Sequence, residues 1–394
     1  AGGPWVCGML RIPAGVRGEP LAAGPGPVPV LRLLRAPRRA LLRGESADWP
    51  SAATSDDAAQ FVESIEQNGL GPLVYARLSD WPIRSRLREI AIHAAAGETS
   101  RLADVRAVLA AFERNSIRVL IIKGTGLAYD IYPSPELRPR GDTDLLIAEF
   151  DLEKVRTILH RRGYTSPLTS GDTLAIRQQS FTRGGHVYDV HWDVANSPVV
   201  RDALPFEELL VRAIAVPRIA PNALAPSHVD ALLLACIHRV AHHHDIERLI
   251  WLYDIHLLRE TMSADDHARF WRLAAERGVV AICERSIELA DEWFALAAHD
   301  RARDWLIEEE RARDEPSAAF LDAGRTRGAV LSGDLKALSW RGRMRRMREL
   351  ALPPIGFMRQ SFPSAPTAAL PALYVWRGAR GVLRLLRRVR PLPH

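Results

Sequence analysis

Cysteine and long apolar runs are scarce in this sequence of 394 residues. The three cysteines, Cys7, Cys236 and Cys283, lie far apart and form no Cys-x-x-Cys pair, which argues against a disulfide framework and against a thiolate zinc site. No apolar run approaches the roughly 20 residues that cross a bilayer, and the first thirty residues lack the apolar core of a signal peptide. These absences predict a soluble protein of the reducing cytoplasm without a transmembrane segment.

Lysine is also rare, because Lys123, Lys154 and Lys336 are the only lysines among 53 lysine and arginine residues. The formal net charge of +6 is modest for this length. Arginine is therefore the default basic residue of the chain. A lysine next to other polar residues that could take part in chemistry is for this reason a candidate functional residue.

Changes in composition and hydrophobic period divide the chain into five segments. Residues 1–55 are rich in Pro, Gly and Arg without a sustained period, which predicts a flexible or loosely docked leader. Amphipathic spacing predicts helices over 56–117, and mixed short periods predict a core domain over 118–220. Residues 221–315 have the pattern of a helical domain, and 316–394 form a basic, partly helical segment.

The core segment contains short apolar runs typical of buried strands, at 118–122 and 143–147. Two further extended runs, at 175–182 and 186–194, flank Arg183-Gly-Gly185, which is a plausible hairpin turn. Helices are expected at 83–115, 127–131, 151–162, 227–243, 247–261, 265–277, 280–298, 300–312 and 373–390. The predicted fold class is α+β: a small mixed sheet with flanking helices and a C-terminal helical domain.

Three aspartates carry the most specific chemical signal. Asp142 and Asp144 are separated by one residue at the start of an apolar run, so both side chains point to the same side of a strand. Asp189 precedes an apolar residue on a later predicted strand. Such clustered carboxylates are costly unless cations neutralise them, and Mg²⁺ prefers oxygen ligands. The sequence therefore predicts a catalytic site with two Mg²⁺ ions.

A glycine-containing turn follows the first predicted strand. In the segment Lys123-Gly124-Thr125-Gly126, the glycines would let backbone N–H groups approach a phosphate, and the next helix would present its N-terminus to the anion. Thr125 would add a hydroxyl donor and Lys123 a charge. Arg138 and Arg140 are expected to steady the triphosphate or the leaving group.

The order of these motifs resembles the nucleotidyltransferase superfamily related to DNA polymerase beta. The motifs Lys-Gly-x-x-Leu-Ala, Leu-Arg-Pro-x-Gly-Asp-x-Asp-Leu-Leu-Ile and Asp-Val-His-Trp are similar to those of the family of uncharacterised nucleotidyltransferases, over roughly residues 60–310. The resemblance implies that Gly124 and Thr125 bind nucleotide, with Thr where Gly-Ser is usual. It also implies that the metal ligands are Asp142, Asp144 and Asp189.

The expected reaction is transfer of a nucleoside monophosphate from ATP or another NTP to an acceptor, with a peptide or a small metabolite as the leading candidates. Three alternatives remain at this point. The first is a toxin-like transferase that modifies tRNA, so that the acceptor is RNA. The second is a kinase of the same fold, and the third is a non-catalytic scaffold that binds nucleotide.

Histidines and arginine clusters outside these motifs have competing interpretations. His191 would face the same side as Asp189, and His238 and His242, one helical turn apart, either support the site, bind zinc or pack structurally. The pair His244-Asp245 with Asp254 faintly resembles metal-dependent phosphohydrolases. The basic clusters at 341–348 and 377–390 fit RNA, anionic lipid, an acidic peptide or simply a solvated arginine-rich face. The terminal cluster, with Leu383, Leu385, Leu386 and Val389 between its arginines, also fits a helix docked onto the protein's own body.

Overall fold

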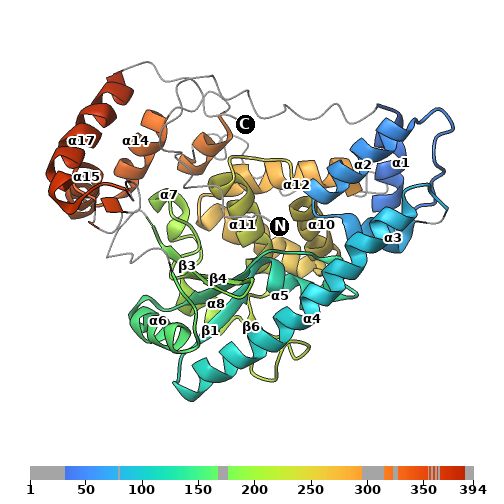
Figure 1. Ribbon diagram of the computed structural model, residues 1–394, viewed down its shortest axis with the longest axis horizontal. Coiled ribbons are helices and arrows are strands. Elements are labelled where there is room, and N and C mark those ends of the chain that lie inside the picture. The colour runs from blue at the N-terminus through green and yellow to red at the C-terminus, as the bar shows by residue number, and fades with distance from the viewer. Residues whose placement is uncertain are drawn as a thin grey trace.

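The computed structural model describes residues 32–386 except 79, 167–175, 295–314, 323–326, 354, 356–357, 360–361 and 363. Figure 1 shows a small sheet at the centre, with helices packed around it and two helices extending along one edge of the molecule. None of the helices in the described part of the chain is both long and apolar enough to cross a membrane. The observed architecture is the α+β class expected from the sequence.

A four-stranded mixed sheet forms the core, in the order β1-β2-β4-β3. Its strands are β1 (Val119–Ile122), β2 (Thr143–Ile147), β3 (Gln178–Arg183) and β4 (His186–His191). The pairs β1–β2 and β3–β4 are antiparallel, whereas β2 and β4 run parallel. Gly184 and Gly185 both have positive φ at the β3–β4 turn, which is the geometry that a two-residue hairpin requires.

Alternate residues of the sheet face two different cores. Ile121, Leu145 and Ile147 pack with the long helix α4 (Arg84–Arg114) and with α6 (Leu152–Arg161). Ile122 and Leu146 belong to a second core, which contains the helices between residues 228 and 294. Because side chains alternate along a strand, residues an even number of positions from Leu146 share its side. The side chain of Asp144 therefore faces this second core.

Residues 32–42 form helix α1 (Arg32–Leu42), so this part of the expected leader is a docked helix and not a flexible segment. Leu41 and Leu42 are buried, and the Arg38 guanidinium lies over the Trp293 ring at 4.6 Å. Pro37 inside the helix obscured the apolar period in the sequence. The first 31 residues of the expected leader lie outside the described residues. Helices α2 (Ser55–Gln67) and α3 (Gly71–Arg77) follow and lead into α4.

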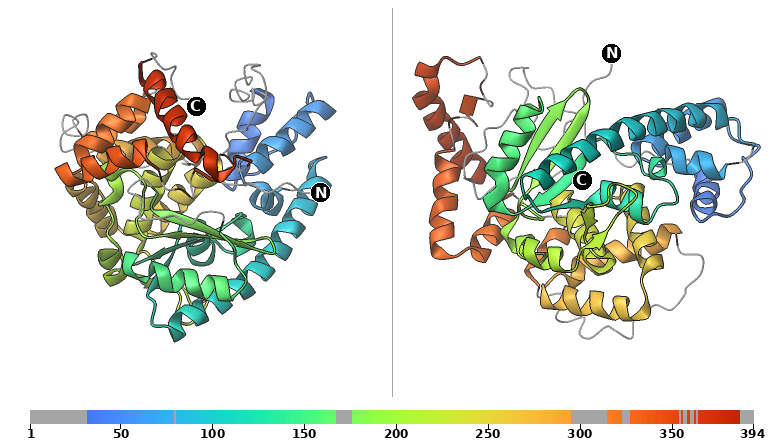
Figure 2. Two further views of the ribbon diagram at one scale, coloured as in Figure 1. Left: turned by 60° about the vertical axis from the view of Figure 1, so that its left-hand side comes forward. Right: turned by 90° about the horizontal axis from the view of Figure 1, so that it is seen from below.

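The helices expected after residue 226 are present with nearly the expected bounds. They are α9 (His228–Ile237), α10 (Leu249–Thr261), α11 (Ala264–Glu276) and α12 (Val280–Phe294). The one expected over 300–312 lies outside the described residues. Figure 2 shows these helices against the sheet, on the side away from α6. The helix expected over 227–243 continues past Ile237 as a π-turn, η3 (His238–His242).

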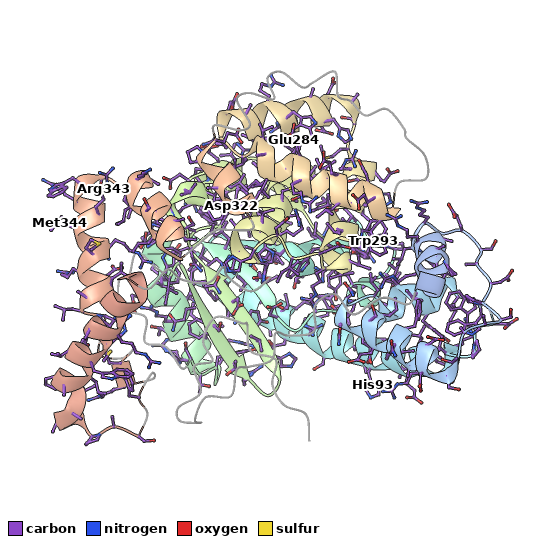
Figure 3. The ribbon with its side chains drawn as sticks, turned by 90° about the horizontal axis from the view of Figure 1, so that it is seen from above. His93, Glu284, Trp293, Asp322, Arg343 and Met344 are labelled. Atoms are coloured by element: carbon purple, nitrogen blue, oxygen red, sulfur yellow. The ribbon has the colours of Figure 1, made fainter. Side chains whose placement is uncertain are left out.

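The basic C-terminal segment forms α14 (Arg327–Ala337), α15 (Trp340–Ala351) and α17 (Leu370–Leu386). Arg343 and Met344 mark α15 at the periphery of the molecule in Figure 3. Trp340, Met344 and Met347 remain exposed. Docking onto the protein's own body is expected from Leu383, Leu385, Leu386 and Val389 of the terminal cluster, and these side chains lie outside the described part of the structure.

Candidate active site

The three predicted carboxylates lie at one end of the central strand pair. Asp144 on β2 and Asp189 on β4 are Cα partners across the parallel ladder. Asp142 precedes β2 by one residue and therefore lies two positions ahead of Asp144. Asp144 and Asp189 are buried, and Asp142 is partly exposed. The sheet thus places all three aspartates next to each other, although they are up to 47 residues apart in the chain.

Asp144 has two nitrogen partners. Its Oδ1 lies 2.7 Å from Nζ of Lys123 and 2.9 Å from Nε2 of His191, and these two nitrogens are 3.2 Å apart. Lys123 reaches Asp144 because it follows Ile122, whose Cα partner is Asp144. The structure therefore brings two residues into direct contact with a predicted metal ligand: Lys123, expected to contact phosphate, and His191, for which the sequence left several roles open.

The pKa values of the three carboxyl groups diverge because their surroundings differ. Burial, together with the charges of Asp144 and Asp189, raises the pKa of Asp142 to about 6. Burial and the charge of Asp144 also raise the pKa of Asp189, although Ser180 donates a hydrogen bond to it. For Asp144 burial acts upward too, but Lys123 and His191 outweigh it and lower its pKa. Mutual repulsion of this kind favours binding of a cation.

In their present orientations, no three His, Cys, Asp or Glu side chains of the described residues are grouped to hold a metal ion. Asp144 is turned to Lys123, and Asp189 accepts from Ser180. The donor set itself suits Mg²⁺, because it consists of carboxylate oxygens on neighbouring strand positions. Metal binding at these residues would require Asp144 to exchange its ammonium partner for the ion.

The glycine turn differs from the expected loop, because helix α5 (Lys123–Asp130) begins directly at Lys123 and not at Leu127. Lys123 has a φ of 54°, a left-handed conformation that costs a non-glycine residue roughly 1–2 kcal/mol. A Cβ on Gly126 would lie 2.7 Å from the Ile121 carbonyl oxygen, and one on Gly124 would lie 3.2 Å from the Arg138 guanidinium carbon. Both glycines therefore permit close packing within the turn.

The residues expected to contact phosphate around this turn have protein partners. The Thr125 hydroxyl accepts a hydrogen bond from Arg140 Nε at 2.9 Å, and Arg140 also pairs with Glu98 of α4. Arg138 donates to both carboxylate oxygens of Asp254 on α10. Arg138 and Arg140 thus connect the turn to flanking helices, which the sequence could not reveal because Asp254 and Glu98 are distant in the chain.

A cluster of aromatic rings lies on the helical side of the site. The rings of His238 and His243 have centroids 4.5 Å apart, His238 and His242 are 5.6 Å apart, and His243 packs on Trp251 at 4.3 Å. Burial and the nearby charge of Lys123 lower the pKa of His242 to about 3 and that of His243 to about 4. These imidazoles are therefore neutral near pH 7 and lie within electrostatic range of Lys123.

The alternative based on His244-Asp245 and Asp254 is not supported by the geometry. Asp245 forms ion pairs with Arg239 and Arg285, and Asp254 pairs with Arg138. Each carboxylate is thus held by arginine. A zinc site at His238 and His242 also lacks a third ligand, because the described residues contain no ligand group of three.

Sequence reasoning missed two residues that border the site, Asp254 as the partner of Arg138 and Arg248 just before α10. Arg248 lies over the ring of Trp251 at 5.0 Å. No sequence motif marks Arg248, because it is one arginine among many. Only the tertiary structure, in which Asp254 of α10 pairs with Arg138, brings it near the carboxylates.

The mixed sheet, the strand-to-helix turn at Lys123 and the aspartates on adjacent strands define the core of a nucleotidyltransferase. The model of a family described as uncharacterised nucleotidyltransferases matches residues 54–295, which is more than half of the chain. The protein therefore belongs to this family and is a nucleotidyltransferase, as the sequence motifs predicted.

Other comparisons give less detail. The solution structure of the antibiotic-resistance factor ANT(2'')-Ia is similar to this chain with a TM-score of 0.35 and 15% sequence identity. The likeness covers 47% of this chain and 96% of that one. No protein of curated function matches this sequence.

Proposed function

We propose that this nucleotidyltransferase moves a nucleoside monophosphate from an NTP, with ATP as the expected donor, to an acceptor oxygen on a peptide or small metabolite. One observation carries the proposal: Asp144 and Asp189 lie opposite each other on neighbouring parallel strands, next to the turn at Lys123. Asp142 lies two residues before Asp144 on the same side. This arrangement combines oxygen ligands for a divalent cation with a helix start that favours phosphate.

In the proposed reaction the acceptor oxygen forms a bond to the α-phosphorus, and the bond from that phosphorus to the bridging oxygen of the β-phosphate breaks. Pyrophosphate leaves. Two Mg²⁺ ions bound to Asp142, Asp144 and Asp189 would stabilise the charge on the attacking and leaving oxygens. Asp189, opposite Asp144 on the neighbouring strand, would take the proton of the acceptor.

Roles of the other residues follow from their positions. Lys123, which pairs with Asp144 and begins the helix at the turn, would pair with a phosphate of the nucleotide once a cation took its place at Asp144. Gly124 lets the backbone come close to that phosphate. His191, which is almost fully buried, holds the Asp144 carboxylate in place through its Nε2.

The test incubates the protein with cell extract, Mg²⁺ and ATP labelled in either the α- or the γ-phosphate. The proposal expects label in an acceptor from α-labelled ATP only, together with release of pyrophosphate. Transfer of the γ-label would instead identify a kinase. Fractionation of the labelled product into protein, small molecules and RNA identifies the acceptor class, and label in RNA would favour the tRNA-modifying alternative.

Variants link the activity to the site. Asp144→Asn and Asp189→Asn should each reduce transfer about 100-fold or more, because each removes a ligand charge from the clustered carboxylates. Asp151→Asn is the matched control: Asp151 is equally buried and belongs to the segment just after β2, but it pairs with Lys154. Undiminished transfer in an Asp142→Ala, Asp144→Ala double variant would refute the proposal.

A further inference from the structure

The cations that the sequence assigned to the triphosphate are already paired with carboxylates. Arg138 binds both oxygens of Asp254, at 2.8 and 2.7 Å, and Arg140 lies 2.6 Å from Glu98. Both arginine side chains are buried with these partners. Breaking a buried pair leaves an uncompensated charge and costs several kcal/mol. These arginines are therefore poorly placed to move onto a substrate.

Arg248 is in a different situation. It is the residue directly before α10, and its guanidinium stacks on Trp251. Within the part of the chain that the structure describes, no carboxylate forms an ion pair with it. Stacking on an aromatic face leaves the edge of a guanidinium, with its N–H donors, free to bind an anion.

Helix α10 also fixes where Arg248 lies relative to the site. Asp254 on the same helix holds Arg138, whose guanidinium carbon is 3.2 Å from the position that a Gly124 Cβ would occupy. The middle of α10, six residues after Arg248, is thereby joined through one ion pair to the arginine beside the nucleotide turn. Trp251, beneath Arg248, packs on His243 and His238.

Arg248 lies close enough to the carboxylates of Asp142 and Asp254 for their charges to act on its pKa. Although Arg248 is exposed, desolvation by neighbouring protein groups and the charge of Arg138 lower its pKa, and the charges of Asp142 and Asp254 only partly oppose this. The neighbouring imidazoles of His238, His242 and His243 have lowered pKa values and are neutral. Next to these neutral imidazoles, Arg248 is a cation that forms no ion pair with a carboxylate among the described residues.

We propose that Arg248 binds the terminal phosphates of the NTP and holds the pyrophosphate as it leaves. The inference rests on the proposed function and adds a substrate contact from the helical domain that the motifs did not identify. The planar guanidinium can donate two parallel hydrogen bonds to one phosphate, and Trp251 fixes its orientation. The helical domain thereby contributes directly to the nucleotide site.

Calorimetry with Mg²⁺ and a non-hydrolysable NTP analogue tests this assignment against the corresponding NMP. Arg248→Ala should weaken binding of the triphosphate analogue about 10-fold or more, because a charge-assisted hydrogen bond is lost. Binding of the NMP should not change, since it lacks the terminal phosphates. Arg248→Lys keeps the charge without the paired donors and should give an intermediate loss.

The matched control is Arg380→Ala, because Arg380 also lies over a tryptophan ring, that of Trp376 at 4.9 Å, on α17. This variant should bind the triphosphate like wild type. In turnover, Arg248→Ala should raise KM for the NTP.

The two proposals fail in different ways. If wild type binds no NTP analogue, both are overturned. If wild type binds the analogue and Arg248→Ala binds it equally well, or loses NMP binding to the same extent, the assignment of Arg248 alone is overturned. Equal thermal melting of wild type and Arg248→Ala excludes misfolding as the cause of a loss.

Discussion

Arg138 and Asp254 form a two-point ion pair that joins the loop before β2 to helix α10. Their sequence separation is 116 residues. The Tyr132 hydroxyl donates a third hydrogen bond to the same carboxylate at 2.7 Å. All three side chains are buried. This pair makes the helical domain and the sheet one unit around the site.

Loss of Asp254 should destabilise the protein strongly. Asp254→Ala leaves the buried Arg138 without its counter-charge, which costs about 3–5 kcal/mol. Urea unfolding followed by circular dichroism measures the free energy of unfolding. Tyr132→Phe is the control, because it removes only one hydrogen bond and should cost about 1 kcal/mol. Equal costs for the two variants would contradict the importance of the ion pair.

Replacement of Lys123 should separate metal binding from turnover. In the free protein the Lys123 ammonium lies where a cation would approach Asp144. Lys123→Met should therefore bind Mn²⁺ more tightly in the absence of nucleotide, while nucleotide transfer falls because a phosphate contact is lost. Titration of Mn²⁺ followed by electron paramagnetic resonance measures the first effect.

Lys154→Met serves as the control for this experiment, since Lys154 also pairs with a buried carboxylate, that of Asp151, but outside the site. Its Mn²⁺ affinity should equal that of wild type. Weaker Mn²⁺ binding in Lys123→Met than in wild type would show that the ammonium does not compete with the metal.

Gly126 should not tolerate alanine. The added Cβ would meet the Ile121 carbonyl oxygen at 2.7 Å, so β1 and α5 would have to separate. The expected cost is about 1–3 kcal/mol. Gly97, in the middle of α4 with open space around it, gives the opposite expectation: Gly97→Ala should stabilise the protein by roughly 0.5–1 kcal/mol. Thermal unfolding of both variants distinguishes the two cases.

The histidine cluster should make the protein sensitive to acid. His242 and His243 have folded-state pKa values of about 3 and about 4, below the ordinary value of 6.5. Their stabilising contribution is complete above pH 6.5, because both are then neutral in the folded and unfolded states alike. As the pH falls below 6.5, the unfolded state takes up protons first, and up to roughly 1.4 kcal/mol per unit is lost for each histidine.

A double variant, His242→Gln with His243→Gln, should therefore have a flatter dependence of unfolding free energy on pH between 6.5 and 4. Replacement of His93, an exposed residue of α4 (Figure 3), serves as the control and should leave the wild-type slope. A slope that the double variant does not reduce would show that the cluster is hydrated enough to accept protons in the folded state.

The local pattern of residues determined much of this protein by itself. The apolar run at 143–147 predicted β2 with its correct bounds. The glycines at 184–185 predicted the hairpin whose second strand carries Asp189, and both have positive φ. The spacing of Asp142 and Asp144 put both on one side of β2, because side chains alternate along any strand. Family membership followed from the same motifs.

The tertiary structure decided the partners of those residues. The parallel pairing of β2 with β4 brought Asp144 opposite Asp189. The position of α10 allows Asp254 to form an ion pair with Arg138. It also leaves Arg248 beside the site, stacked on Trp251. The sequence could not distinguish these arginines, because an ion pair depends on which helix reaches the charge and not on the neighbouring residues. Local periods determine the elements, whereas contacts between distant segments determine which charges remain available to a substrate.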